Sequence, residues 1–271
     1  YQNVHQSKLV ISLNSLPEYT SNLKWATETQ QDDYQKFFQE TEVDYPQINS
    51  NILQIEDEYY AIARPKSSSD SNQRLTTKLN DTGVDYIELR SLDVNPFQRI
   101  GIDLDTVHFL EMFLLYCTLK SSPSINNDEI EESRENDLLV ATKGREPGLS
   151  LSKNRTKISL QNWANQILDE MMPIAEMLAN KTTNFTSIIR KFGTQIMDPD
   201  QTLSGMLLNK ALSEKMSFHE LGRTLGEDYK NHYISRETSK NSEWSLLEKE
   251  SADSIKRQVV LEQASEQSFE G

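Results

Sequence analysis

One short segment of this chain combines residue types that could bind an anion together with a metal ion. In segment 86–97 polar and apolar residues alternate, and a strand points successive side chains to opposite faces. Tyr86, Glu88 and Arg90 are therefore expected on one face. A carboxylate suits Mg²⁺, and a guanidinium can bind a phosphate or carboxylate through two hydrogen bonds. The alternative is an ordinary Glu/Arg pair facing solvent on a half-exposed sheet.

A second group of residues that could bind a ligand lies upstream. Tyr60, Ile62, Arg64 and Lys66 share one face if a strand runs up to Pro65. Two cations beside an aromatic ring could contact a triphosphate. Basic residues at the end of a strand more commonly face water, so the pattern alone leaves both interpretations open.

Three elements are expected to position these residues. Apolar periodicity predicts a helix over Leu16–Ala26 and a strand over Val84–Val94. The stretches Asn49–Ile55 and Tyr59–Arg64 are rich in Ile, Leu and Tyr, and they predict a hairpin joined by an acidic turn and closed by the following proline. Ser67–Gly83 has no apolar period and predicts a long, mobile loop.

The rest of the chain has helical character. Asp103 or Asp105 can cap a helix that runs to about Lys120 and is apolar on most faces, which predicts a place at the centre of the core. Helix follows helix from Ser159, and Ser217–Glu220 has the capping-box pattern. The fold predicted is α+β, with residues 1–100 as the sheet-forming part of a catalytic domain and 101–271 as a helical C-terminal region.

Composition excludes several classes of function. The 271 residues carry a formal net charge of −14, which disfavours binding to nucleic acid or to an anionic membrane surface. The longest apolar stretch, Phe109–Leu119, is too short to span a bilayer. It contains the single cysteine, Cys117, which we expect to be buried. The four histidines are scattered, so any metal should be a hard cation held by carboxylates.

Several of these segments together resemble a known enzyme family. The matching segments, in order and spacing, are Gln47–Glu56, Tyr60-Ala61, Arg64-Pro65-Lys66, Tyr86–Phe97 and Ile100–Asp103. They are similar to bacterial-type glutamate–cysteine ligase (γ-glutamylcysteine synthetase), and the similarity extends over essentially the whole chain.

The resemblance implies a fold, a reaction and a compartment. The fold would be part of a curved, mostly antiparallel sheet like that of glutamine synthetase, followed by helices. The reaction would be the first step of glutathione biosynthesis in the cytoplasm. The γ-carboxylate of L-glutamate attacks ATP to give a γ-glutamyl phosphate, from which the amine of L-cysteine displaces phosphate. Bound Mg²⁺ would neutralise the crowded oxygens.

The resemblance also implies roles for single residues. Glu88 matches a carboxylate that binds Mg²⁺, and Arg90 matches a catalytic arginine that steadies the transferring phosphoryl group. Tyr60 matches a tyrosine of the cysteine pocket, and Tyr1 would be its partner there. Arg64 and Lys66 match cationic positions near the nucleotide.

The chain is expected to be the C-terminal half of such an enzyme. It starts at Tyr1 without an initiator methionine, and the family's other metal-binding carboxylates belong to an N-terminal half. That half is an expected partner, and this polypeptide alone is predicted to be inactive. Two other hypotheses stay open: a non-catalytic interaction or regulatory module that keeps the ligase fold, and an unrelated carboxylate–amine ligase or kinase. The pairing of Glu88 with Arg90 argues against the first of these.

Overall fold

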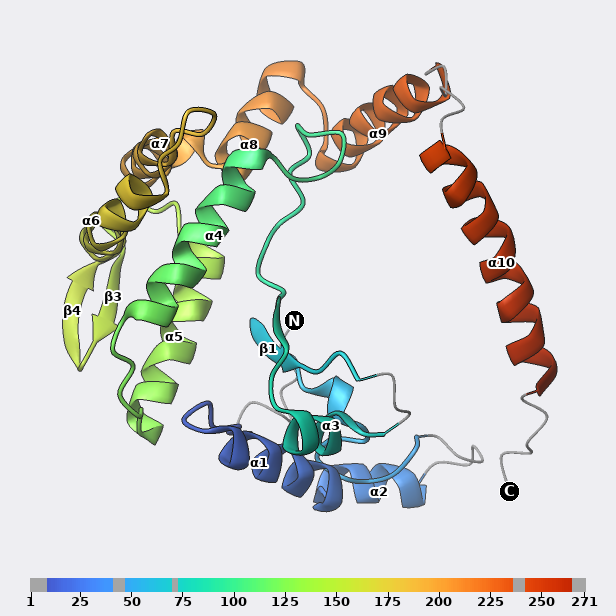
Figure 1. The fold of residues 1–271 in the computed structure, drawn as a ribbon. Helices are drawn as coiled ribbons and strands as arrows, with labels where there is room; N and C mark the ends of the chain where they lie inside the picture. Colours follow the sequence, from blue (N-terminus) through green and yellow to red (C-terminus); the bar gives the residue numbers. More distant parts are fainter. Residues whose placement is uncertain (1–8, 41–46, 70–72, 236–241, 265–271) are drawn as a thin grey trace. The chain divides into compact units, whose positions relative to one another are not determined.

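The structure is a computed structural model that describes residues 9–40, 47–69, 73–235 and 242–264. The chain forms two compact units, Tyr1–Met206 and Leu207–Gly271 (Figure 1). The helices of the first unit are α1 (Leu16–Glu28), α2 (Asp32–Glu40), α3 (Leu75–Thr82), α4 (Leu104–Leu119), α5 (Asn127–Lys143), α6 (Leu160–Leu178) and α7 (Phe185–Met197). Its strands and 3₁₀ turns are β1 (Ala63–Lys66), β2 (Tyr86–Leu89), β3 (Ser150–Lys153), β4 (Thr156–Ser159), η2 (Glu56–Glu58) and η3 (Pro199–Gln201).

The first hydrophobic core lies beneath α1 and α3. The hydroxyl of Ser15 accepts a hydrogen bond from Glu18 N and so caps α1, which confirms the predicted helix at this position. Spacing by three or four residues turns one side of α1 inward. The buried residues of this core are Leu9, Ile11, Tyr19, Leu23, Ala26, Leu53 and Leu79.

The predicted hairpin of 49–55 with 59–64 is wrong. The acidic residues between them form η2, and β1 pairs antiparallel with β2 instead. Pro65 lies inside β1 rather than after it. Because Arg90 N donates to Ile62 O, alternation along the ladder puts Pro65 in a position whose backbone nitrogen points away from β2. A proline is therefore tolerated there. The predicted strand over 84–94 is real but limited to β2.

The predicted loop over 67–83 is also wrong in part, because its second half is α3. The N-cap residue Arg74 makes no capping side-chain hydrogen bond. The carboxylate of Glu56 replaces it: Oε2 accepts from Thr76 N at 3.0 Å and Oε1 accepts from Thr76 Oγ1 at 2.5 Å. A distant residue thus caps a helix that its own sequence only weakly predicts.

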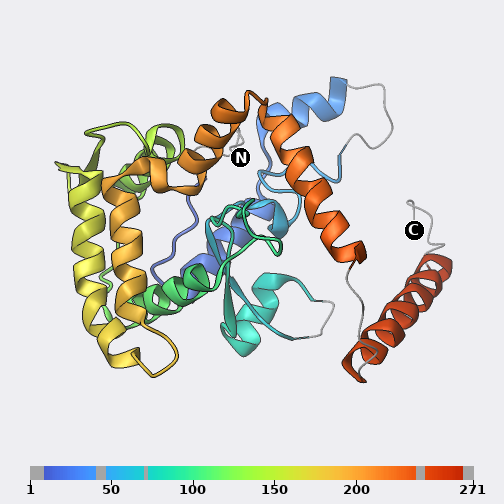
Figure 2. The same cartoon turned by 90° about the horizontal axis from the view of Figure 1, so that it is seen from above.

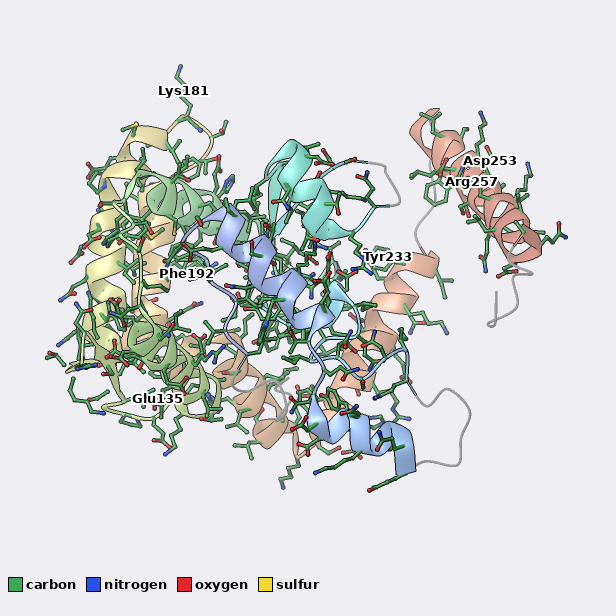
Figure 3. All side chains as sticks on the ribbon, turned by 90° about the horizontal axis from the view of Figure 1, so that it is seen from below. Glu135, Lys181, Phe192, Tyr233, Asp253 and Arg257 are labelled. Atoms are coloured by element: carbon green, nitrogen blue, oxygen red, sulfur yellow. The ribbon has the colours of Figure 1, made fainter. Side chains whose placement is uncertain are left out.

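The second core joins α4, α6 and α7. Asp103 caps α4 by accepting from Thr106 N at 2.7 Å, as predicted. Figures 1 and 2 show α6 and α7 side by side. Phe192 of α7, which is labelled in Figure 3, lies with its ring centroid 4.2 Å from that of Phe109 on α4. The buried residues are Met112, Tyr116, Leu168, Met171, Ile174, Ala175, Phe185, Ile188 and Ile189.

Two predictions about α4 need correction. Only Met112 and Tyr116 of this helix are buried, while Leu104 and Leu119 are exposed, so α4 covers the core with one face and is not central to it. Cys117 is exposed. Successive helical residues are about 100° apart, so the burial of Tyr116 turns its neighbour Cys117 away from α6 and α7.

The strands β3 and β4 form a tight hairpin that contacts α5 and α6 (Figure 1). Its turn residues Asn154 and Arg155 have φ of 52° and 60°, which is the left-handed geometry of a two-residue hairpin loop. The helix α8 (Leu203–Glu214) crosses the boundary between the two units.

The second unit contains α9 (Phe218–Ser235) and α10 (Ser242–Ala264). The predicted capping box of α9 is confirmed: Ser217 N donates to Glu220 Oε2 at 2.8 Å, and Glu220 N donates to Ser217 Oγ at 3.3 Å. Within the described residues, none of the helices combines the length and apolar character that crossing a membrane requires.

Candidate active site

The register of β1 and β2 brings the two predicted groups of residues together. Arg64 pairs with Glu88, and Lys66 pairs with Tyr86. Residues directly opposite each other in an antiparallel pair project from the same face. Three cationic positions (the third is Arg90, just beyond β2) and one carboxylate therefore share a face. This face is locally positive in a chain whose net charge is −14.

Glu88 is the centre of this group. Its Oε2 accepts a hydrogen bond from Arg90 Nη2 at 3.2 Å, and Lys66 Nζ lies 3.5 Å from the same oxygen. Its Oε1 receives no hydrogen bond from the part of the chain that the structure describes. The side chain of Glu88 is 37% exposed, so part of it can be reached from outside. The predicted alternation that puts Glu88 and Arg90 on one side is confirmed.

The two cations fix the charge of the carboxylate. The hydrogen bond from Arg90 is the largest influence, and together with the charges of Arg90 and Lys66 it holds the pKa of Glu88 below its ordinary value. Glu88 is therefore ionised at neutral pH. Its charged oxygen is held by the side chains of Lys66 and Arg90.

Arg64 lies in a different environment from Lys66, two residues along the same strand. Its side chain is fully buried, and its Nη2 donates to Asp57 Oδ1 at 3.0 Å and to Glu56 O at 3.4 Å. Its Nε and Nη1 are buried without a hydrogen-bond partner among the described residues. In this conformation Arg64 contributes charge to the face but cannot touch a ligand. The predicted nucleotide contact of Arg64 stays a prediction, and its burial favours another role.

The structure describes one of the two tyrosines predicted for the cysteine pocket. Tyr60 lies between η2 and β1 and is 50% exposed, so its ring can contact a ligand. Tyr1 lies outside the described residues. The pairing of these two tyrosines stays a prediction.

The donor set suits a hard metal ion only in part. Glu88 offers an ionised oxygen ligand of the kind that Mg²⁺ prefers. Within the described ranges there is no cluster of three or more His, Cys, Asp or Glu side chains that could hold a metal. Glu88 can therefore be one ligand of a Mg²⁺ site, and the remaining ligands must come from elsewhere.

Sequence reasoning missed the partners of Arg64. Glu56 and Asp57 were assigned to a hairpin turn, whereas they bind Arg64 and cap α3. A usable signal was present: Arg64 and Lys66 complement Glu88, and opposite charges on two alternating segments favour pairing across a sheet.

Comparison with known proteins identifies the family. The glutamate-cysteine ligase family matches residues 1–140. A glutamate–cysteine ligase of Alcanivorax borkumensis is 36% identical over 277 residues, which cover 100% of this chain and 53% of that protein. One of Shewanella oneidensis is 35% identical, over 97% of this chain and 50% of that protein. The chain thus spans about half the length of the curated relatives it matches.

The fold agrees with solved structures. A Francisella tularensis glutamate–cysteine ligase in complex with AMP superposes with a TM-score of 0.88 at 27% identity, covering 98% of this chain and 53% of that one. A bifunctional glutathione synthetase of Pasteurella multocida shares the fold with a TM-score of 0.61 at 21% identity, over 86% of this chain and 26% of that one. These findings confirm the predicted family and the predicted α+β fold class. The chain belongs to the glutamate–cysteine ligase family.

Proposed function

We propose that this chain supplies part of the active site of an ATP-dependent glutamate–cysteine ligase. The observation that carries the proposal is the face of β1 and β2, where an accessible carboxylate, Glu88, lies between the cations Lys66 and Arg90. Membership of the family supports the reaction class. The AMP bound to the Francisella relative supports the use of a nucleotide.

The reaction would proceed in two displacements. An oxygen of the L-glutamate γ-carboxylate bonds to the γ-phosphorus of ATP, and the bond to the bridging oxygen breaks to release ADP. The amine of L-cysteine then bonds to the acyl carbon, the acyl carbon–oxygen bond breaks, and inorganic phosphate leaves as the amine gives up a proton. Negative charge accumulates on the phosphoryl oxygens in the first displacement, and fixed cations stabilise it.

The residues of this chain divide that work. Arg90 can hold two oxygens of the phosphoryl group through its planar fork. Lys66 supplies a point charge toward the nucleotide phosphates, whereas the guanidinium of Arg64 is buried and paired with Asp57. Tyr60, with Tyr1, would line the pocket for the cysteine side chain. Glu88 would hold Mg²⁺, which when bound neutralises phosphate oxygens and polarises the phosphorus for attack.

The rest of the site would come from the other half of the protein. One carboxylate cannot complete a Mg²⁺ site, and the chain covers about half of its relatives. We therefore propose a cytoplasmic enzyme in which an N-terminal half supplies the other metal ligands. L-glutamate, L-cysteine and ATP are its proposed ligands, with no nucleic-acid or membrane partner.

The test compares the chain alone with the full-length protein. We expect γ-glutamylcysteine to form with the full-length protein, ATP and Mg²⁺, and turnover by residues 1–271 alone to fall below it by at least about a thousandfold. Coupled ADP release and mass detection of the dipeptide measure both. A full-length protein that binds these ligands without turnover would favour the alternative, a non-catalytic module that keeps the ligase fold. Appreciable turnover by the chain alone would contradict the proposed division of the site.

A further inference from the structure

The burial of Arg64 calls for an explanation that nucleotide contact does not provide. Its side chain is 0% exposed, and two of its nitrogens, Nε and Nη1, have no hydrogen-bond partner among the described residues. Burying a guanidinium with incomplete hydrogen bonding is costly. The hydrogen bonds that it does make both go to one place, the η2 turn, through Asp57 Oδ1 and Glu56 O.

That turn begins the segment that carries Tyr60. The carbonyl of Glu56 accepts from Tyr59 N at 3.3 Å, which closes η2, and also from Arg64 Nη2 at 3.4 Å. At the far end of the segment, Ile62 O accepts from Arg90 N at 2.8 Å. Tyr60 therefore lies between two anchors, one made by the side chain of Arg64 and the other by the backbone of Arg90.

We infer that Arg64 is a positioning residue, whose buried guanidinium holds the η2 turn so that the ring of Tyr60 stays oriented for the thiol-bearing amino-acid substrate. This inference rests on the proposed function, because it assigns Tyr60 to the cysteine pocket. One nitrogen of the guanidinium, Nη2, reaches both a carboxylate and a carbonyl on the same turn. A lysine would keep the charge on a more flexible stem and would lose the planar group that packing can hold in place.

The environment of Arg64 supports an anchoring role. Tyr19 of α1 lies beside the guanidinium, and its hydroxyl is buried there. Burial raises the pKa of Tyr19, although the neighbouring charge of Arg64 opposes the rise. The guanidinium is thus enclosed by protein and held against the η2 turn, where it cannot contact a ligand.

The test measures substrate constants in the full-length enzyme. We expect Arg64→Gln to raise the KM for cysteine by about tenfold and to leave the KM for ATP within about twofold, since only one substrate contacts Tyr60. Arg64→Lys should rescue little of this loss. Asp57→Asn should give a smaller shift in the same direction, and it remains informative if Arg64→Gln does not fold, because Asp57 is 67% exposed.

A double-mutant cycle shows whether Arg64 acts on the KM for cysteine through Tyr60. In a Tyr60→Ala background, Arg64→Gln should raise the cysteine KM no further, because the positioned ring is gone. Met112→Ala in the other core is the control for destabilisation alone. It should leave the ratio of the two KM values unchanged.

Three results would overturn the inference. They are a larger rise in the KM for ATP than for cysteine, independent effects of Arg64→Gln and Tyr60→Ala, and unchanged hydrogen exchange at the amides of residues 59–62 in Arg64→Gln. The exchange measurement needs no substrate. If the wild-type full-length protein makes no γ-glutamylcysteine, the proposed function and the link to cysteine fail together, and faster exchange at these amides still reports the anchor.

Discussion

The two strand pairs of this molecule have the same size and antiparallel form, and they use their carboxylates in opposite ways. β3 and β4 are joined by a tight turn, and Glu132 of α5 closes it. Its oxygens accept from Ser152 Oγ at 2.6 Å, Asn154 N at 2.9 Å and Arg155 N at 2.7 Å. The β1–β2 pair is joined through α3, and its carboxylate, Glu88, meets only two side-chain cations among the described residues.

The pKa alone does not separate these two carboxylates. The pKa of Glu132 is lowered first by the hydroxyl of Ser152 and then by backbone amides, whereas that of Glu88 is lowered first by Arg90. The donors make the difference. Backbone amides cannot leave Glu132 without opening the turn, whereas Lys66 and Arg90 hold Glu88 through side chains alone. We therefore expect Glu88 to be available to a ligand and Glu132 to be structural.

The largest effect that this comparison predicts is a difference in kcat between variants of Arg90 and Arg155, one arginine from each strand pair. Arg90→Met in the full-length enzyme should lower kcat by about a hundred- to a thousandfold, because a fixed donor to developing phosphoryl charge is lost. Arg155→Met removes a cation from the other strand pair, where Arg155 is 80% exposed and pairs with Asp128. Its kcat should stay within about twofold of wild type. Steady-state rates of ADP release measure both variants, and similar losses in both would break the distinction.

The next effect concerns the metal. Glu88→Gln should shift the Mg²⁺ concentration needed for half-maximal activity upward by at least about tenfold, because a neutral amide replaces a charged ligand. Glu132→Gln should not change it, although loss of the turn contacts should lower the melting temperature by about 2–4 °C. Titration of activity with Mg²⁺ and thermal unfolding separate the two variants. An unchanged Mg²⁺ requirement in Glu88→Gln would show that Glu88 is not a ligand.

Local signals in the sequence predicted the parts of the fold that local chemistry determines. The caps Ser15 and Asp103 and the box at Ser217–Glu220 lie where a hydroxyl or carboxylate can satisfy a free amide. Alternation also put Glu88 and Arg90 on one side. These predictions need no knowledge of distant residues.

Pairing and burial could not be predicted in the same way. Alternation along β1 is compatible with any partner strand, and only the complementary charges of Arg64, Lys66 and Glu88 favour β2 over residues 49–55. The helix α3 depends on a cap from Glu56 and on the burial of Leu79, which are tertiary effects. The burial of Arg64 is a tertiary effect as well, because its partners Glu56 and Asp57 lie on the η2 turn. Lys66 and Arg64 look equivalent in the sequence, and only their neighbours make the first a half-buried cation beside Glu88 and the second a fully buried one.

The smallest effect is a difference in how pH and salt act on stability. Both folded-state pKa values are lowered, so each carboxylate contributes stability above its unfolded pKa of roughly 4.3, and that stability is lost as pH falls through the folded pKa. The melting temperatures of wild type and Glu132→Gln should therefore converge by about one or two degrees between about pH 5.5 and pH 3.5. Glu88→Gln should converge with wild type in the same direction. Salt distinguishes them: about 0.5 M NaCl should screen the partly exposed ion pairs of Glu88 and weaken their contribution, while the hydrogen bonds from the backbone amides of Asn154 and Arg155 should preserve that of Glu132. Equal salt sensitivity at both sites would mean that Glu88, like Glu132, is fixed by the fold.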